Sequence, residues 1–114
     1  IIDAYNANPS SMQVSIDNFH RMKVADKLLI LGDMRELGND SEAEHQRIID
    51  QLTEYGFTQV MLVGPLFAAT KHPFRSFADA PSLIETLQAE QPQGKTILIK
   101  GSNGIRLFSI VEYL

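Results

Sequence analysis

The sequence predicts an α/β domain with a Rossmann-like, mostly parallel open sheet and helices on both faces. Three observations support this fold class: strand-like and helix-like patterns alternate, the strand-like runs are apolar without polar alternation, and short polar loops separate them. Continuous apolar strands are typical of parallel sheets covered on both faces. Alternating elements of this kind are joined by right-handed crossovers.

The first part of the chain predicts a short strand followed by a helix. The strand opens at Ile1 and ends near Ala4. The helix begins with Asn8 as its N-cap and Pro9 at its first helical position, and these residue types are preferred there. Apolar residues then recur at helical spacing and are expected to face the core: Met12, Ile16 and Phe19.

A second strand and helix follow, separated by a polar loop. The strand is the apolar run 27–31. The helix is expected to begin with a capping box made by Ser41 and Glu44 and to end at Gly56. Its apolar stripe consists of Ile48, Leu52 and Tyr55.

The second half of the chain continues the alternation. A strand over 59–63 is followed by a short helix over 66–70 and a short strand over 74–77. A helix over 81–90 then leads to a buried strand over 96–99. The pattern ends in a last helix, whose apolar stripe consists of Leu107, Val111 and Leu114.

The length and composition are those of one globular domain. The chain has 114 residues, of which 44% are hydrophobic and 21% charged. The net charge is −4, and no basic stretch favours nucleic acid as a partner. The apolar runs are too short to cross a membrane, and the lack of cysteine fits a reducing compartment. Because the chain opens inside an apolar strand without an initiator Met, we expect residues 1–114 to be excised from a longer protein.

Three polar loops come directly after predicted strands, at residues 3–9, 32–38 and 100–104. In open parallel sheets, ligands bind beyond the carboxyl ends of the strands. Two of the loops also lead into the N-terminus of a helix, where backbone N–H groups favour anions. The three loops are therefore the predicted functional region.

The first loop carries side chains that suit a nucleotide. The carboxylate of Asp3 can accept hydrogen bonds from ribose hydroxyls, and the ring of Tyr5 can stack on a base. The amides of Asn6 and Asn8 can both donate and accept. An ordinary turn followed by a helix cap explains the same residues, so spacing alone leaves both interpretations open.

The other two loops combine charge with glycine. Asp33 lies between two glycines beside further charged residues, in either a binding site or a solvated loop. In the third loop, Lys100 and Ser102 accompany glycines and suit a carboxylate or phosphate, although a helix cap by Ser102 or Asn103 is the alternative. The P-loop pattern G-x-x-x-x-G-K-[ST] occurs nowhere in the chain.

The histidines predict no metal site. His45 lies on the apolar side of its helix and is expected to be a buried, hydrogen-bonded structural residue. His20 and His72 have no partner at ligand spacing. No Ser-His-Asp order or nucleophile elbow is visible.

Three segments resemble motifs of the Mur ligases that add D-alanyl-D-alanine. Residues 3–12 read D-A-Y-N-A-N-P-S-S-M, which is similar to D-x-Y-N-A-N-P-x-S-M in that family. Residues 31–38 read L-G-D-M-R-E-L-G, which resembles L-G-D-M-x-E-L-G, and Ser41 and His45 fit its S-x-x-x-H continuation. Residues 100–105 read K-G-S-N-G-I, which is similar to K-G-S-R-G-M. Together, in the same order, the motifs resemble the C-terminal domain of these enzymes over nearly the whole chain.

The resemblance implies a bacterial, cytoplasmic amide-bond ligase of peptidoglycan synthesis. Such enzymes use ATP and Mg²⁺ to form an acyl phosphate on UDP-N-acetylmuramoyl-tripeptide, which the amine of D-alanyl-D-alanine then attacks. They have an N-terminal domain for the UDP-sugar, a central ATPase domain with the P-loop and metal ligands, and a Rossmann-like C-terminal domain. By this resemblance, the 114 residues hold no catalytic residue or metal ligand of their own and are inactive alone.

The resemblance also assigns residues to roles. It implies ATP contacts for Asp3, Tyr5, Asn6 and Asn8. It implies contacts with the incoming dipeptide and the reaction centre for Asp33, Lys100, Ser102 and Asn103. Asn103 stands where the family usually has Arg, which weakens the expectation of bidentate carboxylate binding there.

Two other classes of protein fit parts of the pattern. A phosphoacceptor receiver domain has a similar order of strands and helices, and Asp3, Asp33 and Lys100 lie at comparable strand ends. A receiver has two adjacent acidic residues after its first strand, however, whereas this chain has one. In a pure interaction domain the loops would carry no ligand, and replacing Asp3 or Lys100 would leave ligation unchanged.

Overall fold

The computed structural model describes residues 2–3, 8–34, 37–90 and 94–101, with residues 2–3 described as backbone only. The elements are, in chain order, β1 (Ile2–Asp3), α1 (Pro9–Arg21), β2 (Lys27–Gly32), a 3₁₀ turn (Gly38–Asp40), α2 (Ser41–Glu54), β3 (Val60–Val63), α3 (Pro65–Ala68), β4 (Arg75–Phe77), α4 (Ala80–Glu90) and β5 (Thr96–Lys100). The predicted helix carrying Leu107, Val111 and Leu114 lies outside the described residues. Within the described part, the predicted alternation of strands and helices is confirmed.

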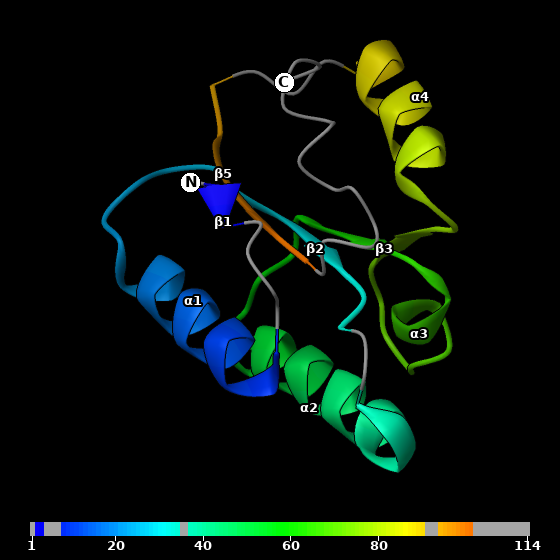
Figure 1. Ribbon diagram of the computed structural model, residues 1–114. Helices are drawn as coiled ribbons and strands as arrows, with labels where there is room; N and C mark the ends of the chain where they lie inside the picture. The colour runs from blue at the N-terminus through cyan, green and yellow to red at the C-terminus, as the bar shows by residue number, and fades with distance from the viewer. Residues whose placement is uncertain (1, 4–7, 35–36, 91–93, 102–114) are drawn as a thin grey trace.

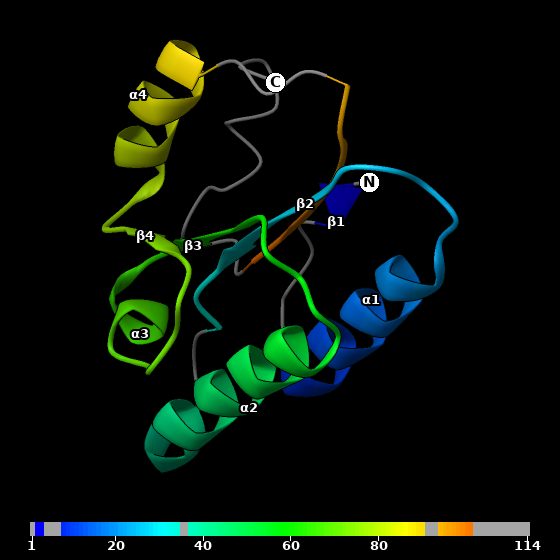
Figure 2. The same cartoon turned by 180° about the vertical axis from the view of Figure 1, so that it is seen from behind.

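All strand pairs of the sheet are parallel, in the order β1-β5-β2-β3-β4. The chain moves across the sheet in one direction from β2 to β4 and then returns to β5. Because crossovers are right-handed, the returning connection places its helix on the opposite face. Accordingly, α1 and α2 lie side by side on one face, and α4 lies on the other (Figures 1 and 2). The predicted Rossmann-like class is therefore confirmed.

Each face of the sheet carries a separate apolar core. β2 supplies both cores, because its alternate side chains point to opposite faces. The core under α1 and α2 includes Met12, Ile16, Phe19, Leu29, Leu31, Met34, Ile48, Ile49, Leu52, Val60, Leu62, Phe67 and Leu98. The core under α4 includes Leu28, Ile30, Met61, Val63, Ala80, Leu83, Leu87 and Ile99. This double coverage explains why β2 is buried from its second residue onward.

Helix α1 begins as predicted, and with a stronger cap than predicted. The side-chain oxygen of Asn8 accepts the amide of Ser11 at 2.9 Å, and the Asn8 amide donates to the Ser11 hydroxyl at 3.1 Å. This reciprocal pair is a capping box. Pro9 occupies the first helical position, where its missing N–H costs nothing.

The capping box predicted at Ser41 and Glu44 is wrong. The 3₁₀ turn runs directly into α2, so Asp40 already has helical dihedral angles of φ −85° and ψ −6°. An N-cap needs an extended backbone for its side chain to turn back toward the helix. Ser41 is therefore inside the helix, and the side chain of Asp40 at the N-cap position makes no capping hydrogen bond.

Candidate functional site

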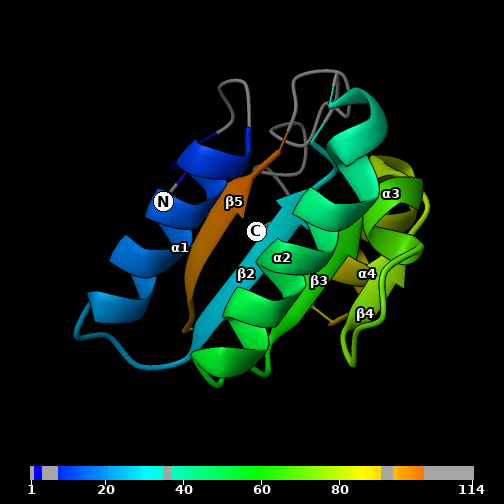
Figure 3. The ribbon, with the colours of Figure 1, turned by 90° about the horizontal axis from the view of Figure 1, so that it is seen from below.

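The three predicted loops leave the sheet where its parallel strands end, and this side of the sheet is named here the carboxyl edge. In the register of the sheet, Lys100 at the end of β5 pairs with Asp3 of β1 on one side and Leu31 of β2 on the other. Asp33 follows two residues after Leu31, and its amide donates to the carbonyl of Val63 at 3.0 Å. The arrowheads of β5 and β2 point to this common edge (Figure 3). The backbone positions of Asp3, Asp33 and Lys100 therefore converge as the sequence predicts.

Not every predicted site residue is described. Only the strand backbone of Asp3 is described, and its side chain is not. Four further predicted site residues lie outside the described residues: Tyr5, Asn6, Ser102 and Asn103. The side chains whose surroundings the structure describes are those of Asn8, Asp33 and Lys100.

Lys100 is buried between two neighbouring strands at the edge, with 2% of its surface exposed. An ammonium group removed from water is stable only when other groups pair with it or accept its hydrogen bonds, and Lys100 does have interaction partners. A lysine held in this way forms a fixed positive charge at the carboxyl ends of the strands.

The carboxylate of Asp33 joins the end of β2 to helix α3. Its two oxygens accept the backbone amides of Leu66 at 2.8 Å and Phe67 at 2.9 Å, and the residue is 3% exposed. These amides belong to the first turn of α3, where negative charge is favourable. Gly64 makes the approach possible, since a Cβ on it would lie 2.3 Å from the Asp33 carboxyl carbon. Asp33 is thus a helix cap, and its contact with a substrate stays a prediction.

His45 is buried and hydrogen-bonded, which confirms its predicted structural character. Its Nε2 accepts the backbone amide of Met34 at 3.0 Å, and its Nδ1 lies 2.6 Å from the carbonyl oxygen of Ser41. The edge of its ring contacts Phe67, with 4.7 Å between ring centroids. His45 therefore contacts the start of the same loop that Asp33 ties to α3.

A polar depression of about 580 Å³ lies between the N-terminal ends of α1 and α2. Both ends follow strands that finish at the edge holding Lys100, so the depression adjoins the converging loops. Its lining includes Asn8, Gln13, Glu44 and Arg47. The cap of α1 uses only the oxygen of Asn8, and its Nδ2 makes no hydrogen bond with any residue that the structure describes. Asn8 is exposed and lines the depression.

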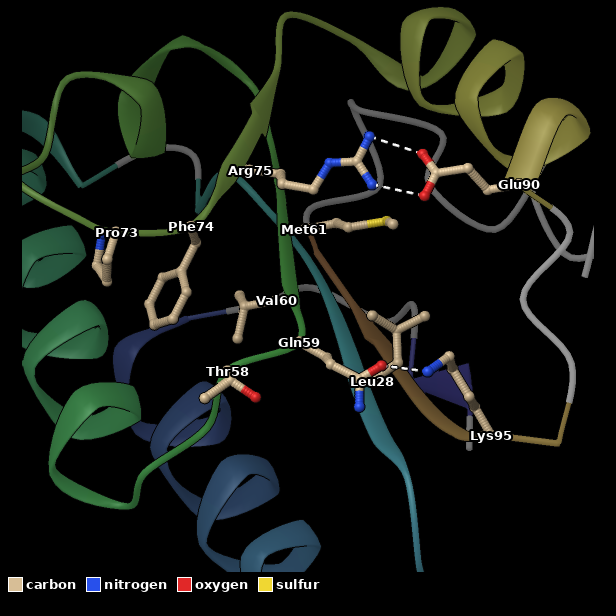
Figure 4. A pocket seen from close by; sticks show the side chains of 10 residues that line it. All are labelled: Leu28, Thr58, Gln59, Val60, Met61, Pro73, Phe74, Arg75, Glu90 and Lys95. Atoms are coloured by element: carbon tan, nitrogen blue, oxygen red, sulfur yellow. Dashed lines mark hydrogen bonds and ion pairs between the residues drawn. The ribbon is translucent and has the colours of Figure 1, made fainter.

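A second pocket, of about 320 Å³, lies at the opposite edge of the sheet, where β2, β3 and β4 begin. Figure 4 shows its polar side chains in two pairs: Arg75 forms an ion pair with Glu90 at 2.7 Å, and Lys95 donates a hydrogen bond to Gln59. The ion pair raises the pKa of Arg75 and lowers that of Glu90. Because these side chains already pair with one another, this pocket offers little to an ionic ligand.

Two further findings concern the described residues. They contain no group of three or more His, Cys, Asp or Glu side chains arranged to hold a metal ion. No helix in the described part of the chain has the length and hydrophobicity of a membrane span.

Sequence reasoning missed two contacts that shape this edge. The capping box between Asn8 and Ser11 was signalled by Asn-Pro followed by two serines, which is a recognisable helix start. The approach of Gly64 to Asp33 had no local signal, because 31 positions separate the two residues along the chain (64 − 33).

Comparison with known proteins shows the family to which the chain belongs. Residues 1–103 match the family described as "Mur ligase, glutamate ligase domain". The chain is 33% identical to a UDP-N-acetylmuramoyl-tripeptide–D-alanyl-D-alanine ligase from Rickettsia prowazekii, over 99% of this chain and 26% of that protein. A ligase with the same name from Escherichia coli is 35% identical, over 98% of this chain and 26% of that protein. The chain thus spans about a quarter of the length of the curated relatives it matches.

The structure shows the same similarity. It superimposes on the crystal structure of a MurF ligase from Thermotoga maritima in complex with ADP, with a TM-score of 0.79 and 25% sequence identity. The match covers 98% of this chain and 27% of that chain. These similarities give no support to the receiver interpretation, and the burial of Asp33 also argues against it. A phosphoacceptor carboxylate must be open to its phosphodonor, whereas both oxygens of Asp33 are bound by amides.

Proposed function

Since the chain belongs to the Mur ligase family by its glutamate ligase domain, we propose that it is the C-terminal domain of a D-alanyl-D-alanine-adding ligase. The complete enzyme would join D-alanyl-D-alanine to UDP-N-acetylmuramoyl-tripeptide in the cytoplasm, using ATP and Mg²⁺. The observation that carries this proposal is the convergence of Asp3, Asp33 and Lys100 at one edge of the sheet.

In this proposal the carboxyl edge holds the incoming dipeptide through Lys100. A carboxylate that leaves water is bound strongly where a fixed cation and hydrogen-bond donors meet it. Lys100 supplies such a cation, and Ser102 and Asn103 follow it closely in the sequence as possible donors. Asp33 contributes by ordering the neighbouring loop or by touching the amine side of the dipeptide.

The first loop, with the adjoining depression, suits a nucleotide. A volume of about 580 Å³ lies within the range of small-molecule sites, and its lining is polar. Asn8 lines it, and the Nδ2 of Asn8 makes no hydrogen bond with the residues that the structure describes. We assign Asp3 to the ribose hydroxyls, with Tyr5 and Asn6 as further contacts of ATP, and we note that one relative was crystallised with ADP.

The central domain of the same polypeptide would supply the remaining machinery. Phosphoryl transfer needs a phosphate cradle and a metal ion to neutralise charge, and this chain has no P-loop sequence. We therefore assign the Mg²⁺ ligands to the central domain and the UDP-sugar site to the N-terminal domain. The role left to this domain is to close over the nucleotide and to hold the amine donor near the activated carboxyl group.

The test compares two lysines in the full-length enzyme. Lys100→Met removes the fixed cation at the carboxyl edge, and Lys95→Met removes a cation at the opposite edge. Loss of a buried charge partner weakens binding by about 2 kcal/mol or more, so we expect kcat/KM for the dipeptide to fall at least about 30-fold in Lys100→Met. Lys95→Met should keep nearly full activity. Equal activity of both variants, together with an active Asp3→Ala variant, would support the pure interaction domain instead.

A further inference from the structure

The segment that leaves β2, Asp33 and Met34, is held by two other elements and is named here the β2 exit. The Asp33 carboxylate accepts two amides of α3. The Met34 amide donates to Nε2 of His45 on α2 at 3.0 Å. The side chain of Met34 is fully buried in the core beneath α1 and α2. The position of the β2 exit therefore depends on α2 and α3 as well as on the sheet.

The hydrogen bonds define the protonation of the His45 ring. A backbone amide can only donate, so Nε2, which faces Met34, must be an unprotonated acceptor. The Ser41 carbonyl can only accept, so Nδ1 must carry the ring hydrogen. This neutral form satisfies the buried Met34 amide and fixes the orientation of the ring. No other side chain in the described part of the chain accepts that amide.

The β2 exit lies beside the fixed cation of the carboxyl edge. Lys100 is in register with Leu31, two residues before Asp33, and β5 and β2 are neighbouring strands. A shift of the β2 exit would change the backbone of the strand that neighbours Lys100, and with it the shape of this edge. A displacement of about 1 Å in a positioning element can reduce turnover by up to about 100-fold.

We propose that His45 is a positioning residue of the ligation reaction: through Nε2 it holds the β2 exit in place, so that the incoming dipeptide meets Lys100 in the correct geometry. This inference rests on the proposed function. It assigns no contact with substrate to His45, which is fully buried. Its effect passes entirely through the backbone of Met34.

The hydrogen bond from the Met34 amide to Nε2 of His45 is named here the anchor. Two substitutions separate the effect of the anchor from that of the packing of the ring. Gln places its side-chain oxygen as many bonds from the backbone as Nε2 of histidine, so His45→Gln keeps an acceptor for Met34. Asn places its amide nitrogen as many bonds away as Nδ1, so His45→Asn keeps a donor for the Ser41 carbonyl and loses the anchor. Both variants lose the ring contact with Phe67, so their loss of packing is matched.

The experiment measures steady-state kinetics of both variants in the full-length enzyme. We expect His45→Asn to raise KM for D-alanyl-D-alanine by about tenfold or more and KM for ATP by less than about threefold. His45→Gln should restore KM for the dipeptide to within about threefold of wild type. A variant that is only less stable has fewer active molecules, which lowers kcat and leaves every KM unchanged.

Three results have distinct meanings. If the two variants have the same KM for the dipeptide, or if only kcat falls, the positioning role is refuted. If His45→Asn raises all substrate KM values equally, the anchor does not act at the dipeptide side and the inference also fails. If the wild-type enzyme does not ligate D-alanyl-D-alanine at all, it is the proposed function that fails.

Discussion

Replacing Gly64 by alanine tests the contact that joins the ends of β2 and β3. Gly64 has φ +114° and ψ 159°, a backbone conformation that residues with a Cβ rarely adopt. A Cβ there would lie 2.3 Å from the carboxyl carbon of Asp33 and 2.4 and 2.6 Å from its oxygens. The new methyl group must therefore push away the carboxylate that caps α3.

The magnitude has two parts. The unfavourable backbone conformation costs about 1–3 kcal/mol. Loss of hydrogen bonds to a buried, charged acceptor costs about 1.5–3 kcal/mol. Together we expect Gly64→Ala to lower the free energy of unfolding by about 2.5–6 kcal/mol, a large part of the 5–15 kcal/mol typical of a domain. The assay is urea-induced unfolding followed by far-UV circular dichroism.

Gly56 provides a matched control. It also has a positive φ of +79°, but an added Cβ would meet no atom within 4 Å. Gly56→Ala should therefore cost only about 1–2 kcal/mol from backbone strain. Equal destabilisation by the two substitutions would refute the steric argument.

A double-mutant cycle isolates the clash itself. In an Asp33→Ala background the carboxylate is absent, so Gly64→Ala should cost only its backbone part of about 1–3 kcal/mol. The coupling between the two positions is then the hydrogen-bond part alone, about 1.5–3 kcal/mol. Strict additivity would show that the two residues do not contact each other as the structure describes.

Three further predictions concern the helix caps and the isolated chain. Asn8→Ala should lower the free energy of unfolding by about 1 kcal/mol in urea titrations, because it removes the capping box of α1. Asp79 directly precedes α4, and its carboxylate accepts the backbone amide of Ser82 in the first turn of that helix. This hydrogen bond lowers the pKa of Asp79. Its stabilising effect is therefore present above the unfolded-state pKa of Asp79 and is lost as pH falls through the lowered folded-state pKa. Urea midpoints of wild type and Asp79→Ala should accordingly differ at neutral pH and converge in acid. The isolated 114 residues should show no ligation of D-alanyl-D-alanine in a product assay, because they lack a P-loop, and any measurable ligation would contradict this prediction.

Much of the fold could be predicted because its signals are local. Continuous apolar runs identified β2 and β3 as covered strands, and the structure gives them as Lys27–Gly32 and Val60–Val63. Asn8 and Pro9 identified the start of α1. The predicted boundaries lie close to the observed ones, since each depends on a cap, a glycine or a change in periodicity that is visible within a few residues.

The errors and omissions arose where distant or conformational information decides the outcome. Ser41 and Glu44 have the right spacing for a capping box, but a preceding 3₁₀ turn gives the backbone helical angles before Ser41 is reached. The order of the strands depends on where the connection after β4 returns to the sheet. It places β5 between β1 and β2. Neither feature is encoded by residue type at a single position.

Asp33 shows why a site can be located from sequence more readily than its residues can be assigned roles. An aspartate after a buried parallel strand is suited to bind a ligand and equally suited to cap a nearby helix, because both tasks need only an acceptor at the carboxyl edge. The structure shows the capping contacts at 2.8 and 2.9 Å. Both oxygens are bound by amides and the residue is 3% exposed, so the capping role is the one that the structure describes, and contact with a substrate amine stays a prediction. The cap holds this carboxylate where β2 and β3 end, so the aspartate that the sequence predicts for a binding site is fixed there as part of the scaffold.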